Sequence, residues 1–319
     1  MFAPDPLHFV SGASAPADIR GLAEWSVPLG ISLSELSRPA LHTLRGYACM
    51  PLLRIFVDSG AFSETDRTGA VVCPISDTVW IERVRTMHLL AATFGPPAPA
   101  GNYGPRVYVV APDRVGDQPE TLRRLALHAE AMRACHALGA VVVVPIQRGA
   151  MTAATFDRAA CETLGFDSFA RGIPGNKIAM PYAELEAFLR ERRPASVHLL
   201  GVGPNGKTYE PLTTLVRRVL GDVGMSCDSN TLAASVGRTN GPGGGPRRLT
   251  ALQDAATNDS ALKRIFSKKS QREMAVWMAF GPARLHQLVV NELRASGHIR
   301  EERSPVQMDL FDKVSTLDT

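Results

Sequence analysis

The stretch that decides the fold runs from Gln118 to Val144 and reads QPETLRRLALHAEAMRACHALGAVVVV. Apolar residues recur there at the spacing of one helix face, at Leu122, Leu125, Ala129 and Met132. Gly139 then ends the helical pattern before four consecutive valines, which are typical of a strand buried on both faces of a parallel sheet. The stretch therefore predicts a helix over 118–139 that leads into a buried parallel strand.

The same alternation extends outward in both directions along the chain. Strand-like runs fall at 7–10, 27–31, 54–58, 106–112, 140–146, 168–172, 197–202 and 224–228. Helical patterns follow most of them, so the order of elements predicts an α/β protein with a (β/α)8 TIM barrel. An open doubly wound sheet has the same alternation, and periodicity alone does not separate the two folds.

The pattern changes after residue 240. The run Gly241-Pro242-Gly243-Gly244-Gly245-Pro246 predicts a linker, and helical patterns without strand signals follow it. We therefore expect a barrel domain over 1–240, a Gly-rich linker and basic helical extension over 241–303, and an unstructured tail over 304–319.

Bulk composition narrows the class of protein. The 319 residues suit one large domain with an appendage. There is no run of eighteen apolar residues and no basic segment before an apolar one at the N-terminus, so we expect a cytoplasmic protein without a membrane span or signal peptide. Five cysteines without paired spacing predict reduced, mostly buried thiols, and eight histidines form no metal-ligand pattern. No metal site or cofactor is expected.

Positive charge is concentrated in the predicted extension. Residues 241–280 contain seven Lys or Arg against three Asp or Glu, an excess equal to the net charge of +4 of the whole chain. Such a cluster after a catalytic barrel suits contact with a nucleic-acid backbone, for which the candidates are Lys263, Arg264, Lys268 and Lys269. A solvated helix face explains the same charges and is the commoner cause of such a run.

Two carboxylates stand at the ends of predicted strands. The strand at 54–58 ends in Asp58 and continues into Ser59-Gly60-Ala61-Phe62, and the strand at 224–228 ends in Asp228. Because α/β enzymes hold their chemistry at these strand ends, the two acids suggest an acid/base and a nucleophile. Each has a structural alternative: Asp58 as a turn residue and Asp228 as a helix N-cap.

Five short motifs occur in one order over about residues 50–240. They are Asp58-Ser59-Gly60-Ala61-Phe62, Val110-Ala111-Pro112-Asp113, Pro145-Ile146-Gln147-Arg148-Gly149, Leu199-Leu200-Gly201-Val202-Gly203 and the late strand that ends in Asp228. In this order they resemble the tRNA-guanine transglycosylase superfamily, which favours the closed barrel over the open sheet. The resemblance implies base exchange through a covalent intermediate, with Asp228 as nucleophile and Asp58 as acid/base.

The resemblance also implies a site for the base. Asp113 and Gln147 look like the pair that reads the guanine edge, and contacts with the base are expected from Ser59, Phe62, Gly172 and Gly201. Asp117 competes with Asp113, but Asp113 directly follows a strand whereas Asp117 has the sequence pattern of an N-cap. The chain departs from the family at Ala61 and Ser63, which replace a usual Gly and Gln, and in the spacing of the glycine-rich loop expected at 171–175.

Within the superfamily the chain most resembles the DpdA-type DNA 7-deazaguanine transglycosylases of phages and bacteria. The cysteines lack the Cys-x-Cys-x-x-Cys spacing of the zinc site in the tRNA enzymes. The resemblance implies exchange of guanine in DNA for a 7-deazaguanine such as preQ0, with DNA, the free base and other DNA-modification proteins as partners. Two alternatives stay open: a tRNA-guanine transglycosylase without the zinc module, and a non-catalytic nucleic-acid-binding subunit. His198, in an apolar strand, is assigned a structural role.

Overall fold

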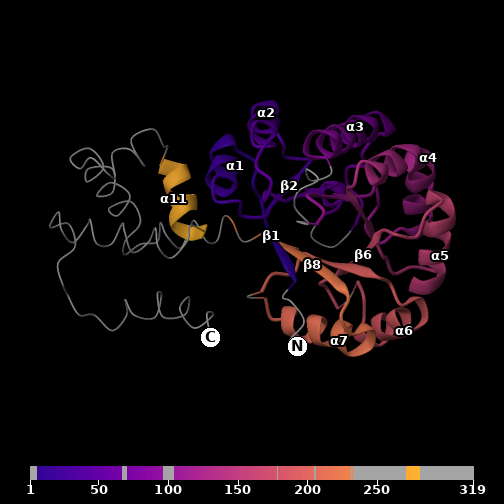
Figure 1. Cartoon of the computed structure of the whole chain (residues 1–319). Coiled ribbons are helices and arrows are strands. Elements are labelled where there is room, and N and C mark those ends of the chain that lie inside the picture. The colour runs from indigo at the N-terminus through magenta and orange to yellow at the C-terminus, as the bar shows by residue number, and fades with distance from the viewer. Residues whose placement is uncertain are drawn as a thin grey trace, which may run out of the picture. The chain divides into compact units, whose positions relative to one another are not determined.

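The computed structural model describes residues 6–66, 70–95, 104–177, 179–204, 206–230, 232 and 271–280. Within them, eight parallel strands close into a barrel in the order of the sequence (Figure 1). The closure is made by Leu7–Ser11 (β1), which pairs with Leu29–Ser32 (β2) on one side and Gly224–Ser229 (β8) on the other. This pairing confirms the predicted (β/α)8 barrel and excludes an open doubly wound sheet.

The remaining strands lie between β2 and β8 in the barrel. They are Ile55–Asp58 (β3), Val107–Val110 (β4), Val141–Pro145 (β5), Ala170–Pro174 (β6) and Ser196–Leu200 (β7). All eight predicted strands are present, with shifts of only a few residues at their ends.

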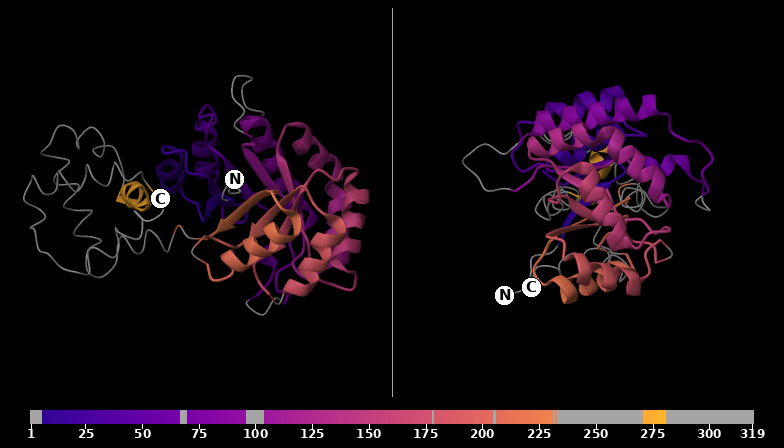
Figure 2. Two further views of the ribbon diagram at one scale, coloured as in Figure 1. Left: turned by 60° about the horizontal axis from the view of Figure 1, so that its bottom comes forward. Right: turned by 90° about the vertical axis from the view of Figure 1, so that its right-hand side faces the viewer.

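Helices surround the strands, as the views in Figures 1 and 2 show. They are Pro16–Ala23 (α1), Arg38–Gly46 (α2), Asp77–Phe94 (α3), Gln118–Ala137 (α4), Ala153–Leu164 (α5), Tyr182–Arg192 (α6) and Tyr209–Leu220 (α7), with a short 3-10 helix at Ala61–Glu64 (η1). The helix predicted at 118–139 is α4.

Short polar side chains begin several of these helices. The side chain of Asp117 accepts a hydrogen bond of 3.0 Å from the backbone N–H of Glu120 at the start of α4, which confirms Asp117 as an N-cap. Beyond the end of α4, Gly139 has a φ of 83°, a left-handed conformation that favours glycine. Local sequence therefore sets where α4 begins and where it ends before β5.

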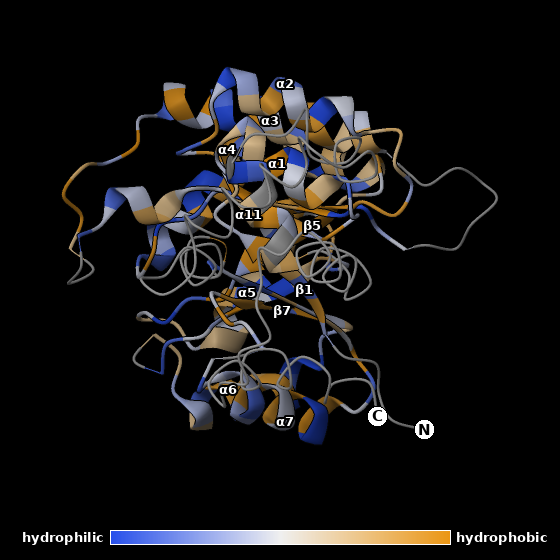
Figure 3. Cartoon of the chain, turned by 90° about the vertical axis from the view of Figure 1, so that its left-hand side faces the viewer, coloured by the Kyte–Doolittle hydropathy of each residue, from blue (hydrophilic) through white to orange (hydrophobic). Residues whose placement is uncertain are grey.

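The alternation of side chains along each strand forms two apolar layers. Facing into the barrel are the buried residues of one cluster, Phe9, Phe56, Val110, Val143 and Ala170. Facing outward, Val142 and Val144 are also fully buried, since helices cover the outside of the barrel. Figure 3 shows the apolar strands inside helices of mixed polarity. Burial on both faces explains why the strands have near-continuous apolar sequences.

The chain divides into two compact units, Met1–Arg238 and Thr239–Thr319. In the second unit, Gln271–Phe280 (α11) is a helix in which Ala275, Val276 and Trp277 are buried. This helix falls inside the predicted extension over 241–303. The rest of that extension, including the Gly-rich run, and the predicted tail over 304–319 lie outside the described residues.

The structure also bears on the membrane span and on the cysteines. None of the helices in the described part of the chain is long and apolar enough to cross a membrane. The cysteines carry no disulfide, but the expectation that they are mostly buried holds only in part, because Cys135 and Cys227 are buried whereas Cys49 and Cys73 are exposed.

Candidate active site

The residues selected from the sequence gather at the carboxyl-terminal ends of the strands. Asp58 is the last residue of β3 and Asp228 lies near the end of β8. Asp113 and Gln147 follow β4 and β5 by a few residues. Because all eight strands are parallel, these ends form one rim of the barrel, which is where barrel enzymes place their chemistry.

The carboxylate of Asp228 is held by three neighbouring elements. Its Oδ1 accepts a hydrogen bond of 2.8 Å from the backbone N–H of Gly201 and lies 3.3 Å from Nε2 of His198. Its Oδ2 accepts a hydrogen bond of 3.1 Å from the Ser11 hydroxyl. Both oxygens therefore have partners on β1, β7 and the residue after β7, independently of any helix cap.

These contacts determine the charge of Asp228. Burial by itself raises the pKa of a carboxyl, but hydrogen bonds from His198, Gly201 and Ser11 favour the charged form and together hold the pKa of Asp228 below its ordinary value. Asp228 is therefore a carboxylate at neutral pH, the form that a nucleophile requires.

Asp58 has different surroundings. Its Oδ2 accepts hydrogen bonds of 2.9 Å from the Ser32 hydroxyl and 3.2 Å from the backbone N–H of Gly60. The second bond is the turn contact expected from the sequence, and Gly60 makes it with a φ of 76°. Burial, with a smaller contribution from the charge of Asp228, raises the pKa of Asp58; the bonds from Ser32 and Gly60 oppose this rise, and the resulting pKa is about 6.

The two strand-end acids thus differ in ionisation. Asp228 stays charged well below neutral pH, whereas the pKa of about 6 lets Asp58 exchange a proton near neutrality. A pair of carboxyl groups whose pKa values are separated in this way suits one nucleophile and one acid/base. The rise in the pKa of Asp58 includes a contribution from the charge of Asp228, so the two groups interact electrostatically.

The predicted base-reading residues contact one another. Asp113 is buried, with Ser59 Oγ donating to its Oδ1 at 3.1 Å and Gln147 Nε2 donating to its Oδ2 at 2.8 Å. The amide oxygen of Gln147 accepts from the backbone N–H of Gly116. Burial and, to a smaller extent, the charge of Asp58 together raise the pKa of Asp113 to about 7. The polar groups of Asp113 and Gln147 are therefore already bonded to each other and to their neighbours.

A buried ion pair supports this part of the rim from behind. Arg124 on α4 donates to both carboxylate oxygens of Glu64, at 2.8 and 2.7 Å, and to the backbone carbonyl of Asp113 at 2.6 Å. Arg83 on α3 donates to the carbonyl of Ser59 at 2.9 Å. These bonds join η1 to the end of β4, and sequence reasoning missed them because charged helix residues usually face solvent.

The other predicted base contacts have mixed outcomes. Phe62 is 70% exposed on η1, so it is not a core residue and its ring is free of the interior. Gly201 has a φ of 67° and its N–H bonds to Asp228. The glycine-rich loop expected at 171–175 is wrong, because β6 continues to Pro174.

Strand packing explains the glycine in β6. The carbonyl of Gly172 accepts a ladder bond of 2.8 Å from the N–H of Ile146. A Cβ at Gly172 would lie 2.9 Å from a methyl carbon of Leu200 and 3.1 Å from the Cα of Pro145. The glycine therefore has a packing reason of its own inside the barrel, independent of any ligand.

Sequence reasoning missed three residues that contact the two acids: Ser11, Ser32 and His198. His198 is fully buried and its ring stacks on that of Phe56, with centroids 4.5 Å apart. The signal for all three is strand alternation: Ser11 and Ser32 are the last residues of β1 and β2, His198 is in the middle of β7, and each lies on the inward-facing side, as Asp58 and Asp228 do. A polar residue at an inward-facing strand position is therefore a sign that the position contributes to the site at the mouth of the barrel.

The predicted basic cluster and the arrangement of metal-ligand residue types remain to be placed. Lys263, Arg264, Lys268 and Lys269 lie outside the described residues. No group of three or more His, Cys, Asp or Glu among the residues that the structure describes is arranged to hold a metal ion.

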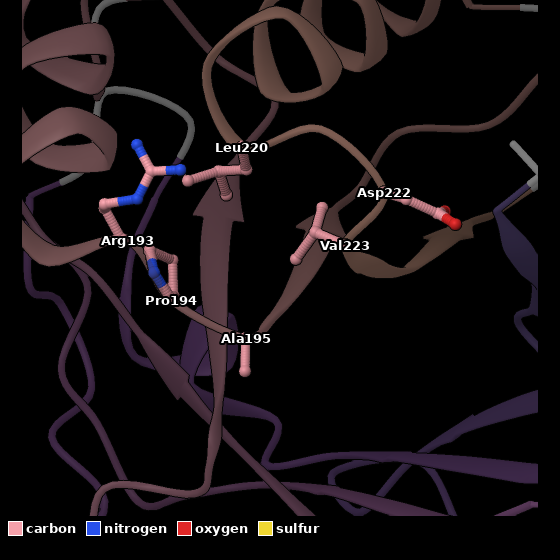
Figure 4. A pocket seen from close by; sticks show the side chains of 6 residues that line it. All are labelled: Arg193, Pro194, Ala195, Leu220, Asp222 and Val223. Atoms are coloured by element: carbon pink, nitrogen blue, oxygen red, sulfur yellow. The ribbon is translucent and has the colours of Figure 1, made fainter.

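A hollow of about 290 Å³ lies at the opposite end of β7 and β8 (Figure 4). It is lined by the residues that precede these strands, Arg193, Pro194, Ala195, Leu220, Asp222 and Val223. Its lining includes none of the residues selected from the sequence, and the amino-terminal end of a TIM barrel is typically a region of stability rather than chemistry. The carboxylate rim is therefore the candidate active site.

The fold and the rim together define a (β/α)8 barrel with a carboxylate site at its mouth. No protein-family model and no curated protein matches the chain. It is similar to the solved structure of a protein assigned as a fructose-1,6-biphosphate aldolase from Coccidioides immitis, with 13% identity, a TM-score of 0.42 and coverage of 85% of this chain and 86% of that chain. It is also similar to Proteus mirabilis N-acetylneuraminate lyase, with 9% identity, a TM-score of 0.38 and coverage of 93% and 100%. These values carry no argument about activity.

Proposed function

We propose that this barrel is an enzyme, a transglycosylase that exchanges guanine in DNA for a 7-deazaguanine base such as preQ0. The observation that carries the proposal is that two carboxyl groups on one barrel rim have pKa values shifted in opposite directions, lowered for Asp228 and raised for Asp58. The order of the five sequence motifs supports the same activity, because it resembles the transglycosylase superfamily over most of the barrel.

The proposed reaction has two displacements at the anomeric carbon of the nucleotide. In the first, a carboxylate oxygen of Asp228 bonds to this carbon while the bond to guanine breaks and its electron pair leaves with the base. Protonated Asp58 supplies the proton that the departing base needs. In the second, Asp58 takes a proton from the incoming base, which displaces Asp228 and restores its carboxylate. Two inversions retain the configuration of the sugar.

The pKa of Asp58 suits both of these roles. At a pKa of about 6, the carboxyl group has both protonation states within reach near neutral pH. A group held entirely in one state would serve only one half of the exchange. The covalent ester with Asp228 meanwhile keeps the sugar from reacting with water until the second base arrives.

Asp113 and Gln147 supply selectivity in this proposal. The carboxyl of Asp113 would accept from the N1–H and exocyclic amine of a guanine-type base, and the Gln147 amide would donate to O6. Because Asp113 is buried, a base without these groups would leave its polar atoms unpaired, which is costly. The present bond of 2.8 Å between the two side chains keeps them paired while the base is absent.

The test is base exchange measured on both polymers. Purified protein is incubated with labelled guanine or preQ0 and either DNA or unmodified tRNA, and the digested nucleosides are then analysed. We expect incorporation into DNA that Asp228→Ala abolishes and Asp222→Ala preserves, since Asp222 is an exposed carboxylate before β8 at the other end of the barrel. Incorporation into tRNA alone would favour the tRNA enzyme, and incorporation into neither would favour the non-catalytic subunit.

A further inference from the structure

His198 is fixed from three sides inside the barrel. It lies on β7 with no exposed surface, and its ring is nearly parallel to that of Phe56, at 8° between planes. Its Nδ1 lies 2.8 Å from the hydroxyl of Ser226, and its Nε2 lies 3.3 Å from Oδ1 of Asp228. Both ring nitrogens thus have polar partners in an otherwise apolar layer, which points to a role beyond filling space.

The partners determine where the ring carries its proton. A carboxylate only accepts hydrogen bonds, so the proton of the neutral ring belongs on Nε2, facing Asp228. Nδ1 is then an acceptor, and the Ser226 hydroxyl donates to it. Ser226 is itself buried. The three side chains form a directed series in which Ser226 orients His198 and His198 donates to Asp228.

This series makes the two oxygens of Asp228 unequal. Oδ1 has two donors, the N–H of Gly201 at 2.8 Å and Nε2 of His198 at 3.3 Å. Among the residues that the structure describes, Oδ2 has one, the Ser11 hydroxyl at 3.1 Å. Hydrogen bonds withdraw electron density from an acceptor oxygen, so Oδ2 is the more nucleophilic of the two.

We propose that His198 is a positioning residue that holds Oδ1 of Asp228 and leaves Oδ2 as the oxygen that attacks the sugar, an inference that rests on the proposed transglycosylase function. The bond from the anomeric carbon to Oδ2 forms as the bond to the departing base breaks. When the incoming base breaks the ester, the electron pair returns to the carboxylate. The N–H groups of His198 and Gly201 stabilise the charge that develops on Oδ1 at that step.

Few other groups titrate beside Asp228. Within the described residues, those that interact with it electrostatically include His8 on β1, Asp58 on β3, His198 on β7 and Cys227, which precedes Asp228 on β8. Burial lowers the pKa of His8 and raises that of Cys227 to about 12, so both are neutral at neutral pH. Substitution of His198 by Phe or by Gln removes the titration of the imidazole itself, so a difference in the acid limb between these two variants reports on Asp228 or Asp58.

The test compares His198→Phe with His198→Gln in the full-length protein. Phenylalanine keeps a ring that can stack on Phe56 but removes the donor, whereas the Gln amide restores an N–H near the position of Nε2. We expect His198→Phe to lower kcat by about 10- to 100-fold, the range for losing a hydrogen bond to a charged group, with little change in KM for the base. His198→Gln should recover most of this loss.

The pH dependence separates positioning from simple packing. Without the donor, the charged form of Asp228 loses a stabilising bond, so its pKa rises and the acid limb of kcat moves to higher pH. Ser226→Ala should cause a smaller shift in the same direction. The control is His88→Phe on the exposed face of α3, which should leave both kcat and the acid limb unchanged.

A measurement without substrate keeps this inference separate from the proposed function. The pKa of Asp228 is read from carboxyl-carbon NMR in wild type, His198→Phe and His198→Gln, with thermal unfolding to verify that each variant is folded. A higher pKa in the Phe variant that the Gln variant reverses supports the proposal. An unchanged pKa in folded His198→Phe overturns it. Absence of exchange by wild type would instead reject the transglycosylase function, whatever the titration gives.

Discussion

Asp228 and Asp113 occupy the same rim, yet their surroundings drive their pKa values in opposite directions. Asp228 accepts from His198, Gly201 and Ser11, and its pKa falls below the ordinary value despite burial. Asp113 accepts from Ser59 and Gln147 and lies near Asp58, and its pKa rises to about 7. Burial penalises the charge of both groups. Donors and neighbouring charges, rather than depth alone, therefore decide which acid on this rim is ionised.

The largest expected effect comes from the ionised acid. Asp228→Ala should abolish exchange and remove any covalent adduct between protein and DNA, because no other described group replaces the attacking oxygen. Adduct formation is followed by denaturing electrophoresis of labelled DNA. Normal turnover by this variant would remove Asp228 from the mechanism and show that its ionised state is not needed for exchange.

Asp58, whose pKa lies between those of Asp228 and Asp113, should have the next largest effect on exchange. Asp58→Asn keeps the shape of the side chain but cannot exchange a proton, so exchange should slow by about 10²- to 10⁴-fold, the usual contribution of general acid/base catalysis. Binding of the free base, measured by calorimetry, should persist. In wild type, the rate should change around pH 6, where Asp58 titrates, and the variant should lose this change.

The ion pair behind Asp113 should matter for stability. Arg124→Met leaves the buried carboxylate of Glu64 without its main partner, so the free energy of unfolding should fall by about 3–5 kcal/mol. The matched control is Arg190→Ala, which breaks an exposed pair with Glu186 and should lower the free energy of unfolding far less. Urea unfolding measures both. Equal losses would mean that the buried pair contributes little to holding the rim.

The raised pKa of Asp113 predicts a pH dependence of stability. In the unfolded chain this carboxyl titrates at its ordinary pKa, whereas in the folded protein it titrates at about 7. Between these values the folded state binds more protons, so Asp113 makes stability fall as pH rises, by at most about 1.4 kcal/mol per pH unit. Asp113→Asn should remove this contribution, measured as the difference in urea unfolding between pH 4.5 and pH 8. An identical pH dependence in both proteins would contradict the raised pKa.

The smallest effect on the chemistry is expected from the basic extension. Neutralising Lys263, Arg264, Lys268 and Lys269 should weaken binding to all DNA sequences and flatten its salt dependence, because fewer counterions are released. Selectivity for the base should not change, since Asp113 and Gln147 remain. Binding is measured by fluorescence anisotropy over a range of salt concentrations. An unchanged slope would make these residues a solvated surface.

The fold was predictable because its signals are local. The valines at 141–144 and the helix before them have the periodicity of their own elements, and the N-cap at Asp117 depends on an N–H three residues away. The same locality identified Asp117 as the N-cap of α4. The loop expected at 171–175 failed for the opposite reason: Gly172 is required by side chains of β5 and β7, which no local pattern reports.

The candidate site was predictable only in part. Strand ends located Asp58 and Asp228, because parallel strands bring their carboxyl ends to one rim. The contacts that set their ionisation come from distant residues, such as Ser11 and His198, which lie 217 and 30 positions from Asp228. His198 has the sequence context of a core residue, and only the ring of neighbouring strands turns it toward a carboxylate.

The order of strands and helices and the positions of the strand-end acids follow from local sequence, because periodicity, caps and glycines act over a few residues. The tertiary structure decided that the sheet closes, through the pairing of β1 with β8, and which acid keeps its charge. Closure requires an interaction between the two ends of the barrel, and the pKa of a carboxyl depends on every donor and charge within a few ångströms. Both are properties of three-dimensional proximity, which the local sequence does not contain.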